Sequence, residues 1–233
     1  DPSVYSGLTG AGGCALVVIK RCGSEGIDKR YEAYDDGTPH YLALSKNEKE
    51  TIRAAKAACG SVVVVLNTAN PIELTPIMAG ELEANAIVWV GTAGSRGFSS
   101  LAKVLAGEVN PSGRLTDIYA ADFTADPTYK NFGRFTYTNS TAGVPDLSGV
   151  LTGGGIGSKE MARPFVEYKE GVYVGYRYYE TAALCDPSFT YGQLDGKGAV
   201  ATPGAVAYPF GYGLSYTTFD QVIESFDGSG DTI

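Results

Sequence analysis

The sequence predicts an α/β fold: a mostly parallel, doubly wound sheet flanked by helices, which is an α/β sandwich. Three short apolar runs, at residues 15–19, 61–66 and 86–90, are rich in β-branched side chains and have the length of buried strands. Helical patterns separate these runs, and strands that alternate with helices form parallel sheets through right-handed crossovers. We expect a long irregular insertion at residues 120–170, and an aromatic-rich segment towards the C-terminus.

The first apolar run leads into a loop flanked by glycines. Residues 15–19 have the pattern of a strand buried on both faces, and Gly23 and Gly26 then allow the backbone to turn sharply. This turn leaves Glu25 at the carboxyl end of the strand, where open α/β sheets place ligands and catalytic groups. Taken alone, a Gly-x-Glu-Gly loop is more often a surface turn, so its interpretation depends on the rest of the chain.

A helix is predicted to begin after Ser45, which has the properties of an N-cap. Glu48 lies three residues later and completes a capping box, and Gly60 supplies a C-terminal stop. The apolar face of this helix is formed by Ile52, Ala55, Ala58 and Cys59. The second strand follows directly, so this helix is expected to connect the first two strands of the sheet.

Further elements continue the α/β pattern. A turn at residues 67–71 precedes a predicted helix at 73–83, and a glycine loop at 91–97 follows the third strand. Residues 98–106 have the pattern of another helix, which Gly107 ends. Residues 114–119 are a candidate for a fourth strand.

The periodicity disappears between residues 120 and 170. Loops of this length are usually functional or disordered, so we expect a partly disordered excursion here. It contains Asn139 in a glycosylation sequon, a triplet that is common by chance. Tyrosines then crowd residues 168–179 and 208–216. They fit either ordinary packing or an aromatic wall that faces a sugar, and composition alone does not choose between these.

Composition and charge exclude several classes of function. The chain has 233 residues and a formal net charge of −8, so we expect no nucleic-acid partner, which would need a surplus of Lys and Arg. No apolar run approaches the roughly 20 residues of a membrane helix. Four scattered cysteines and one histidine, His40, favour neither a disulfide framework, nor a zinc site, nor a Ser/His/Asp triad. Carboxylates are the plentiful acid/base groups, and we expect no metal and no cofactor.

Five segments occur in an informative order along the chain. They are residues 23–29 (GSEGIDK), 62–71 (VVVVLNTANP), 101–115 (LAKVLAGEVNPSGRL), 170–180 (EGVYVGYRYYE) and 208–219 (YPFGYGLSYTTF). Together they resemble the second, α/β-sandwich domain of glycoside hydrolase family 3, the β-glucosidase and β-xylosidase family. Each segment is weak alone, but the resemblance extends from Cys14 to Phe219 in family order.

The resemblance implies a retaining mechanism with two carboxylates. By motif match, Glu25 would be the general acid/base, while Ser24 and Asp28 would contact the substrate. The substrate class would be a β-linked oligosaccharide or glycoside with terminal glucose or xylose. In the family, the nucleophilic Asp comes from a separate N-terminal TIM-barrel domain, and nothing in this chain matches that barrel. The barrel would therefore be a required partner.

The resemblance also implies domain boundaries. Residues 1–219 would form the α/β-sandwich domain, and residues 220–233 a linker or the start of a fibronectin-type module. The chain begins at Asp1 rather than Met, and the family domain has further strands before Cys14, so we expect a part of a longer protein. An exposed sheet edge would then favour an edge-strand homodimer.

Other interpretations stay open at this point. A non-catalytic carbohydrate-binding or scaffold module with the same fold is one alternative, because the loop at 91–97 lacks the Gly-Gln-Glu pattern often found there in the family. A flavodoxin-like nucleotide binder ranks last, because no phosphate-loop motif lies between a strand and a helix. Family members occur inside and outside cells, so cytoplasmic and secreted locations of a bacterial-type protein both remain open.

The residues around Glu25 lead to two further expectations. Arg21, Lys29 and Arg30 would favour the ionised form of Glu25, so the isolated chain is expected to show little or no hydrolysis. If Glu25 is structural instead, the next candidates are the nearby carboxylates Asp28, Glu32 and Asp35.

Overall fold

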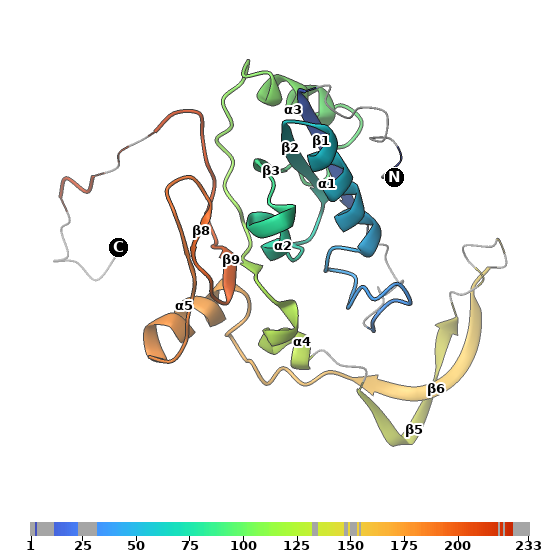
Figure 1. Ribbon diagram of the computed structural model, residues 1–233. Coiled ribbons are helices and arrows are strands. Elements are labelled where there is room, and N and C mark those ends of the chain that lie inside the picture. The colour runs from blue at the N-terminus through green and yellow to red at the C-terminus, as the bar shows by residue number, and fades with distance from the viewer. Residues whose placement is uncertain are drawn as a thin grey trace.

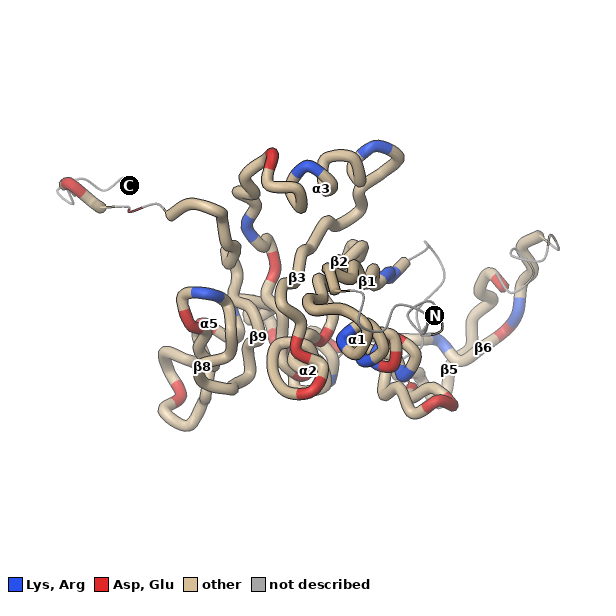
Figure 2. Tube along the Cα trace, turned by 45° about the horizontal axis from the view of Figure 1, so that its top comes forward, with Lys and Arg blue, Asp and Glu red and all other residues tan. Residues whose placement is uncertain are grey.

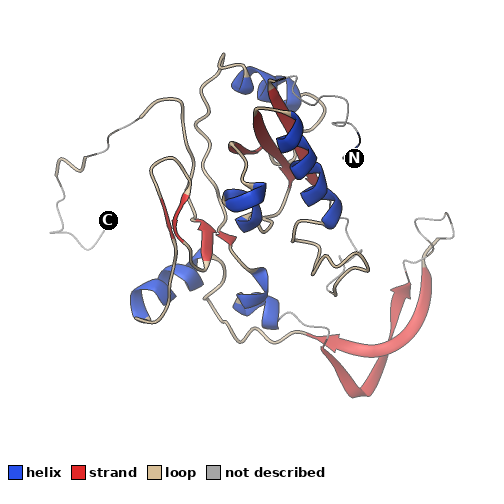
Figure 3. Cartoon of the chain, in the orientation of Figure 1, coloured by secondary structure: helices blue, strands red, loops and turns tan. Residues whose placement is uncertain are grey.

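The chain is a mixed α/β protein built around a parallel sheet (Figures 1 and 3). The computed structural model describes residues 3, 12–22, 32–131, 135–146, 149, 153, 155–218, 220 and 222–225. Its helices and strands in chain order are β1 (Cys14–Arg21), α1 (Lys46–Ala58), β2 (Ser61–Thr68), α2 (Thr75–Met78), η2 (Gly80–Leu82), β3 (Ala86–Trp89), α3 (Gly97–Leu105), β4 (Tyr119–Ala120), η3 (Phe123–Ala125), α4 (Pro127–Asn131), β5 (Phe135–Asp146), β6 (Gly157–Phe165), α5 (Tyr176–Cys185), β7 (Gln193–Leu194), β8 (Val200–Thr202) and β9 (Val206–Tyr208).

The parallel sheet has the order β1-β2-β3 among the described residues. Cys14 is opposite Ser61, and this register continues to Arg21 opposite Thr68. β3 pairs with the other side of β2, with Val63 opposite Ala86. The predicted parallel arrangement of the three apolar runs is confirmed, and all three strands end at the same edge.

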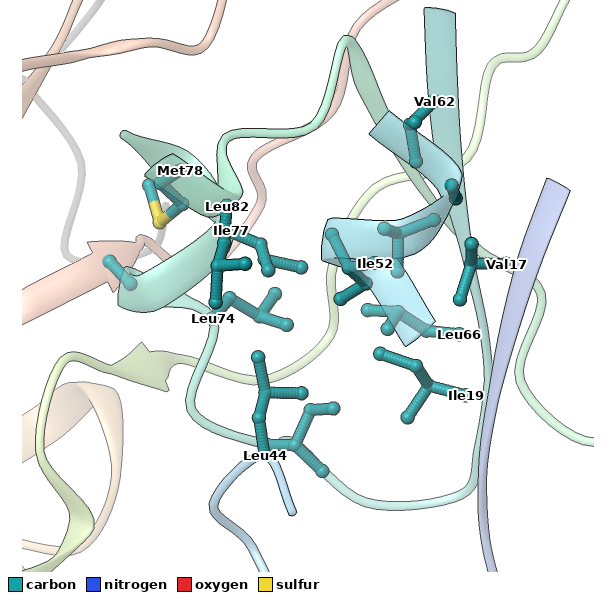
Figure 4. Packing of buried hydrophobic residues seen from close by; sticks show 14 of the residues in the cluster. Val17, Ile19, Leu44, Ile52, Val62, Leu66, Leu74, Ile77, Met78 and Leu82 are labelled. Atoms are coloured by element: carbon teal, nitrogen blue, oxygen red, sulfur yellow. The ribbon is translucent and has the colours of Figure 1, made fainter. Parts of the chain in front are cut away.

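The main core lies between this sheet and α1 (Figure 4). Ile52 of α1 is fully buried and packs with Val17 and Ile19 of β1 and with Leu66 of β2. Burying such a side chain contributes about 1.5–3 kcal/mol. The apolar face of α1 thus packs against one face of the sheet, and this is the face that is buried.

The opposite face of β1 is open. Residues alternate strictly along β1 between exposed and buried, and Leu16 and Val18 are 50% and 55% exposed. The prediction of a strand buried on both faces is therefore wrong for β1. A continuous apolar run does not reveal how many faces are covered, whereas the central strand β2 does bury most of its residues.

The capping signal of α1 is confirmed in full. The Ser45 side chain accepts a hydrogen bond from the Glu48 amide, and the Glu48 side chain accepts one from the Ser45 amide. This reciprocal pair satisfies two amides that the first helical turn leaves without partners. The helix runs to Ala58, as the sequence predicts, before Cys59 turns the chain into β2.

The predicted helix at residues 73–83 is much shorter in the structure. α2 covers only Thr75–Met78, and the separate 3₁₀ turn η2 follows at Gly80–Leu82. Pro76 suits only the first turn of a helix, and Gly80 has a φ of 78°, which ends the helical path. Helix α3, in contrast, matches its predicted range of 98–106 to within one residue.

The fourth strand candidate does not join the parallel sheet. Only its end forms a strand, β4, which pairs antiparallel with β9. Tyr119 lies opposite Tyr208, and their rings make an edge-to-face contact with centroids 6.5 Å apart. Residues 114–119 were predicted from local apolar character, which does not specify the strand with which they pair.

The expected irregular excursion at 120–170 contains a long antiparallel ribbon, β5–β6, which extends away from the body of the molecule (Figure 1). Most residues of both strands are exposed, so the ribbon has no apolar alternation for sequence analysis to detect. Its register shifts between Thr136 and Thr141, which places the sequon residue Asn139 where the pairing of the two strands is irregular. The prediction of an irregular loop is wrong for the residues that form this ribbon.

The C-terminal third packs as a second, smaller cluster. Tyr179 of α5 is 2% exposed and packs with Ile118, Ala120 and Val206, and its ring lies beside those of Tyr178 and Phe189. Tyr179 therefore serves packing, whereas Tyr168 is 74% exposed.

Among the described residues, none of the helices has the length and apolar content that a membrane span needs.

Charged residues are distributed over several elements rather than gathered on one (Figure 2). Basic side chains occur on α1, α3, α5 and β6, and α1 carries acidic residues as well. One of the basic residues, Arg21, lies at the end of β1 and is buried. Arg21 therefore lies at the carboxyl edge of the sheet, where the sequence analysis predicts the catalytic site.

Candidate active site

The carboxyl edge of the sheet is formed by the ends of β1, β2 and β3. β1 ends at Arg21, and Cys22 is the last described residue before the segment 23–31. The predicted site residues Ser24, Glu25 and Asp28 all belong to that segment and so lie outside the described residues. The described residues show how the end of β1, just before that segment, is held to residues 41–48.

Arg21 connects the end of β1 to the chain at residues 41–43. Its Nε donates to the carbonyl of Tyr41 at 2.8 Å, and one terminal nitrogen donates to the carbonyl of Ala43 at 2.8 Å. The other terminal nitrogen donates to the Lys20 carbonyl, and both terminal nitrogens donate to the Glu48 carboxylate, at 2.5 and 2.8 Å. A guanidinium has five N–H donors, and each one has an acceptor here.

Glu48 is shared between this network and the helix cap. Its Oε2 accepts hydrogen bonds from Arg21 and from the Ser45 amide, while its Oε1 accepts from Arg21 alone. Burial opposes ionisation of this carboxyl, but the hydrogen bonds and charge of Arg21 and the Ser45 amide outweigh it. The pKa of Glu48 therefore lies below its ordinary value. The carboxylate stays ionised and balances the buried positive charge of Arg21.

Tyr41 holds the backbone of Cys22. Its hydroxyl accepts a hydrogen bond from the Cys22 amide at 2.8 Å and donates one to the Cys22 carbonyl at 2.6 Å. Burial raises the pKa of this hydroxyl, so it stays protonated and able to donate. Arg21 also lies over the Tyr41 ring, 5.5 Å from its centroid. Arg21, which ends β1, and Cys22, which follows it, are thus both hydrogen-bonded to Tyr41.

His40 is buried in the returning chain and is held in one tautomer. Its Nδ1 accepts a hydrogen bond from the Leu42 amide at 3.2 Å, so the ring hydrogen lies on Nε2, which donates to Oε1 of Glu73 at 3.1 Å. The same Glu73 oxygen accepts the Phe123 amide. These contacts give His40 a structural role in this loop, because both ring nitrogens are occupied.

The reserve candidates Glu32 and Asp35 lie where the described chain resumes after residue 31. Both side chains are exposed. A turn follows them, in which the Thr38 amide donates to Asp36 and the Tyr34 amide donates to the Thr38 carbonyl. Both carboxylates are therefore on the returning side of the segment that contains Glu25.

A small cavity of about 110 Å³ opens beside the ends of β2 and β3. Asn70, Trp89, Asp117 and Tyr119 are among the residues that line it. The Trp89 indole nitrogen donates to the carbonyl of Thr68 at 2.9 Å, which fixes the ring at this edge. The cavity therefore combines aromatic and polar side chains on the side of the sheet where β1 also ends.

The described residues hold no group of three or more His, Cys, Asp or Glu side chains suited to a metal ion. All four cysteines are free, and Cys14, Cys22 and Cys185 are exposed. In the part of the chain that the structure describes, this edge carries carboxylates, hydroxyls, the exposed thiol of Cys22 and the buried guanidinium of Arg21.

The family model of the glycosyl hydrolase family 3 C-terminal domain matches residues 11–176, more than two thirds of the chain. The chain belongs to this family. The expected resemblance is confirmed, and the matched range includes all three parallel strands, the Arg21 network and residues 23–31.

Known proteins similar to this family 3 domain are glycoside hydrolases. Thermostable beta-glucosidase B of Acetivibrio thermocellus is 31% identical over 204 residues, which cover 87% of this chain and 20% of that protein. An exo-alpha-(1->6)-L-arabinopyranosidase of Bifidobacterium longum is 30% identical over 221 residues, covering 94% and 22%. The chain spans about a fifth of the length of the curated relatives it matches.

The fold is similar to solved structures of beta-glucosidases. Beta-glucosidase 3B from Thermotoga neapolitana, solved in complex with glucose, superposes with a TM-score of 0.64 at 27% identity. The aligned region covers 98% of this chain and 25% of that one. The arrangement of this family 3 domain is therefore shared nearly over its whole described length.

Two of the five segments that carry the resemblance contact each other. The Asn110 side chain accepts hydrogen bonds from the Ser215 hydroxyl and the Tyr216 amide, both at 2.8 Å. Nearby, the Leu115 amide donates to the Tyr212 carbonyl. The segment at 208–219 thus packs back onto the residues after α3, which sequence order alone did not predict.

Sequence analysis missed the role of Arg21 in this family 3 domain. It was grouped with Lys29 and Arg30 as a cation beside Glu25, but its side chain is 7% exposed and paired with Glu48. Glu48 was recognised only as part of a capping box. Tyr41 gave no signal, since one tyrosine in a polar loop has no pattern that identifies its partner.

Proposed function

We propose that this chain is the acid/base-bearing domain of a retaining β-glycosidase, a longer protein called here the parent enzyme. Glu25 is the general acid/base, Ser24 and Asp28 contact the sugar, and the nucleophilic carboxylate comes from a separate TIM-barrel domain. One observation carries this proposal. In a chain that belongs to family 3, β1 ends at the carboxyl edge of the parallel sheet, and the Ser-Glu-Gly sequence begins three residues after its last residue.

The chemistry requires one carboxyl group in two protonation states. In the first step, the protonated Glu25 gives its proton to the leaving glycosidic oxygen while the nucleophile attacks the anomeric carbon and forms a glycosyl-enzyme. In the second step, the ionised Glu25 takes a proton from water, which attacks the same carbon and releases the sugar. The two carboxyl groups of a retaining enzyme lie roughly 5 Å apart, so the domains must meet at this edge.

The proposed domain consists of residues 1–219 and has the α/β-sandwich architecture, in which α1 covers one face of the sheet and the face of β1 with Leu16 and Val18 stays open in this chain. The hydrogen bonds from Ser215 and Tyr216 to Asn110 support its C-terminal boundary, because they attach residues up to Tyr216 to the segment after α3. Residues 220–233 are proposed to form a linker or the start of a fibronectin-type module.

The substitution Glu25→Ala in the parent enzyme tests the assigned role. It should slow hydrolysis of substrates with poor leaving groups, such as disaccharides, by roughly 10²–10⁴-fold. Glycosylation by a 2,4-dinitrophenyl glycoside should change far less, because this leaving group departs without protonation. Azide should partly restore turnover of the activated substrate, since it attacks the glycosyl-enzyme without a base. Steady-state kinetics with both substrates, with and without azide, measure these effects.

Two controls complete that experiment. Glu32→Ala and Asp35→Ala remove exposed carboxylates on the returning chain and should not show the same dependence on the leaving group. The 233-residue chain without a barrel should hydrolyse aryl glycosides at the background rate. If Glu25→Ala slows both substrate types equally and azide rescues neither, Glu25 is not the acid/base.

The sugar released is proposed to be terminal β-linked glucose or xylose. The similar proteins include beta-glucosidases and an exo-alpha-(1->6)-L-arabinopyranosidase, so a panel must extend beyond glucosides. Comparing kcat/KM of the parent enzyme on 4-nitrophenyl β-glucoside, β-xyloside and α-L-arabinopyranoside identifies the preferred sugar. A preference for the arabinopyranoside would contradict this part of the proposal.

One feature favours an alternative function, a non-catalytic carbohydrate-binding or scaffold module. The loop after β3 lacks the Gln and Glu that family members often carry there, and has Ser95 and Arg96 instead. The full reading frame distinguishes the two functions. A TIM-barrel region with an Asp-bearing motif supports the enzyme, and a reading frame without a barrel supports the module.

A further inference from the structure

We propose that the antiparallel ribbon β5–β6, residues 135–146 and 157–165, is a docking arm whose aromatic face packs against the barrel domain of the parent enzyme. The arm is an interaction surface, and the proposed reaction gives its residues no chemical role. The identity of the occupant rests on the proposed function, because that function places a barrel domain beside this chain.

The pairing of the two strands brings the large apolar side chains of the arm to one face. Phe135 lies opposite Phe165, and the centroid of the Phe165 ring is 5.6 Å from that of Phe135 and 4.8 Å from that of Tyr137. Side chains at even spacing along a strand share a face, so Met161 lies on the same face as Phe165. A register shift within β5 interrupts this alternation along the sequence, so the face becomes visible only from the pairing.

The composition of this face is typical of an interface. Arg163 lies between Met161 and Phe165 along β6, so aromatic rings, a methionine and an arginine share the face. These residue types are enriched at interfaces between proteins, where Asp, Glu and Lys are depleted. Lys159 and Asp146, nearer the turn of the ribbon, form an ion pair with each other at 3.6 Å. The two strands together carry equal numbers of acidic and basic residues, whereas the whole chain has a net charge of −8.

No described part of the chain buries this face. None of the residues of β5 and β6 is buried, and neither strand contributes to the two apolar clusters of the described structure. Tyr137 is 47% exposed and Met161 is 41% exposed. The ribbon extends away from the body of the molecule (Figures 1 and 3). A two-stranded ribbon alone is at best marginally stable in water, so a partner that covers the apolar face would stabilise it.

The base of the arm is anchored on the carboxyl side of the parallel sheet. Asn131, at the end of α4, donates to Glu170 at 2.5 Å, which joins the chain that enters the ribbon to the chain that leaves it. The ring of Tyr129 in α4 lies 6.0 Å from that of His40, and the residue after His40 is hydrogen-bonded to Cys22, directly after β1. The arm therefore starts on the side where the proposed function requires the barrel to meet this chain.

The size of the face favours a domain of the same polypeptide over a free partner. β6 has 9 residues, which at about 3.3 Å per residue give a paired length of about 30 Å. With a width of about 10 Å for two strands, the face offers about 300 Å², whereas a stable interface between separate proteins takes about 800 Å² per partner. A small interface suffices within one polypeptide, where effective concentrations are roughly millimolar. The curated relatives are about five times as long as this chain, which leaves room for such a domain.

Hydrogen exchange tests the docking without catalysis. Peptides covering residues 135–146 and 157–165 should exchange at least about 10-fold more slowly in the parent enzyme than in the 233-residue chain, which corresponds to about 1.4 kcal/mol. Equal exchange of these peptides in the two proteins would overturn the inference.

Two substitutions on opposite faces of β6 provide a matched comparison. Met161→Lys places a charge on the apolar face and should return the exchange of the ribbon in the parent enzyme to the rate of the isolated chain. Ser158→Lys places the same charge on the other face, where Ser158 is exposed, and should leave the protection intact. In the 233-residue chain both variants should exchange like the wild type, which separates lost docking from an unfolded ribbon. Equal effects of the two substitutions in the parent enzyme would contradict the assigned face.

Photo-crosslinking identifies the occupant. The photoreactive residue p-benzoylphenylalanine at position 137 replaces one aromatic side chain by another, and in the parent enzyme it should crosslink to a peptide of the barrel domain. The same residue at position 158, on the other face, should not. Crosslinks between two copies of the protein would identify a second copy as the occupant and overturn the inference. The absence of any crosslink from position 137 would overturn it as well.

These results are separable from those for the proposed function. If Glu25→Ala shows no dependence on the leaving group but the arm is protected and crosslinks to the barrel, the acid/base assignment fails and the docking arm stands. If Glu25→Ala shows that dependence and the arm exchanges equally in both proteins, the docking arm alone fails. A parent protein without a barrel would overturn both.

Discussion

At the scale of single residues, Glu48 connects the helix cap, the buried guanidinium and the sheet edge. Its carboxylate accepts hydrogen bonds from Ser45 and Arg21, and its pKa lies below the ordinary value of 4.5. A carboxyl whose pKa is lower in the folded state stabilises that state above the unfolded pKa, because the unfolded chain takes up the proton first. This contribution is lost as pH falls from about 4.5 through the lower folded value.

Glu48→Gln should therefore lower stability in a pH-dependent way. At pH 7 we expect a loss of about 1–3 kcal/mol, because the variant leaves Arg21 buried without its counter-charge. The gap between wild type and variant should shrink below pH 4.5, where Glu48 of the unfolded wild-type chain takes up a proton before Glu48 of the folded chain does. Urea unfolding of the chain between pH 7 and pH 3 measures both effects.

The exposed Glu83 provides the control for this titration. Glu83→Gln should differ little from the wild type at any pH in the range. A gap for Glu48→Gln that stays constant from pH 7 to pH 3 would mean that packing, rather than the charge of Glu48, accounts for the loss.

The site residues show where sequence-based inference reaches its limit. Ser24, Glu25 and Asp28 were identified by their motif, and they lie outside the described residues, so their assignment stays a prediction. Tyr41 could not be predicted, because its partner Cys22 is nineteen residues away and neither belongs to a periodic pattern. A contact between two loops depends on the tertiary path of the chain between them, and a local sequence pattern does not specify that path.

At the scale of elements, prediction succeeded where a local signal and the tertiary structure agree. α1 has a capping box, an apolar face and a stop signal, and all three are present in the structure. The helix expected at 73–83 fails because Pro76 and Gly80 lie within it, and both limit a helix to single turns. The ribbon β5–β6 was missed because strands exposed on both faces show no alternation of apolar residues.

The packing of α1 on the sheet gives a prediction at this scale. Ile52 is 0% exposed and packs in the main cluster, so Ile52→Ala should reduce the free energy of unfolding by about 2–5 kcal/mol. Leu184 of α5 is 87% exposed, and Leu184→Ala should change it by less than about 0.5 kcal/mol. Chemical unfolding followed by circular dichroism compares the two. A small loss for Ile52→Ala would show that α1 is not packed as described.

At the scale of the whole molecule, alternation of strands and helices predicted the parallel sheet but not the antiparallel parts around it. The connections from β1 to β2 and from β2 to β3 are local, so the crossover rule specifies their direction. β4 and β9 are more than eighty residues apart, and their pairing depends on the return of the C-terminal segment. Short strands with distant partners have no sequence signal of their own.

The outer edge of β1 leads to the last prediction, an edge-strand homodimer. β1 is an edge strand of the sheet in the described structure, its first six residues carry no charge, and Leu16 and Val18 are exposed on its open face. Such an edge lacks the charges and prolines that normally prevent pairing between sheets. We expect light scattering to show a dimer of the 233-residue chain at micromolar concentration, and Val18→Lys to shift it to monomer, because a charged side chain would then lie in the interface. Lys20→Glu, which exchanges one exposed charge for another near the end of the strand, is the control and should leave the dimer intact. A monodisperse monomer of the wild-type chain would refute the dimer and leave the exposed face of β1 to a covering segment of the parent enzyme.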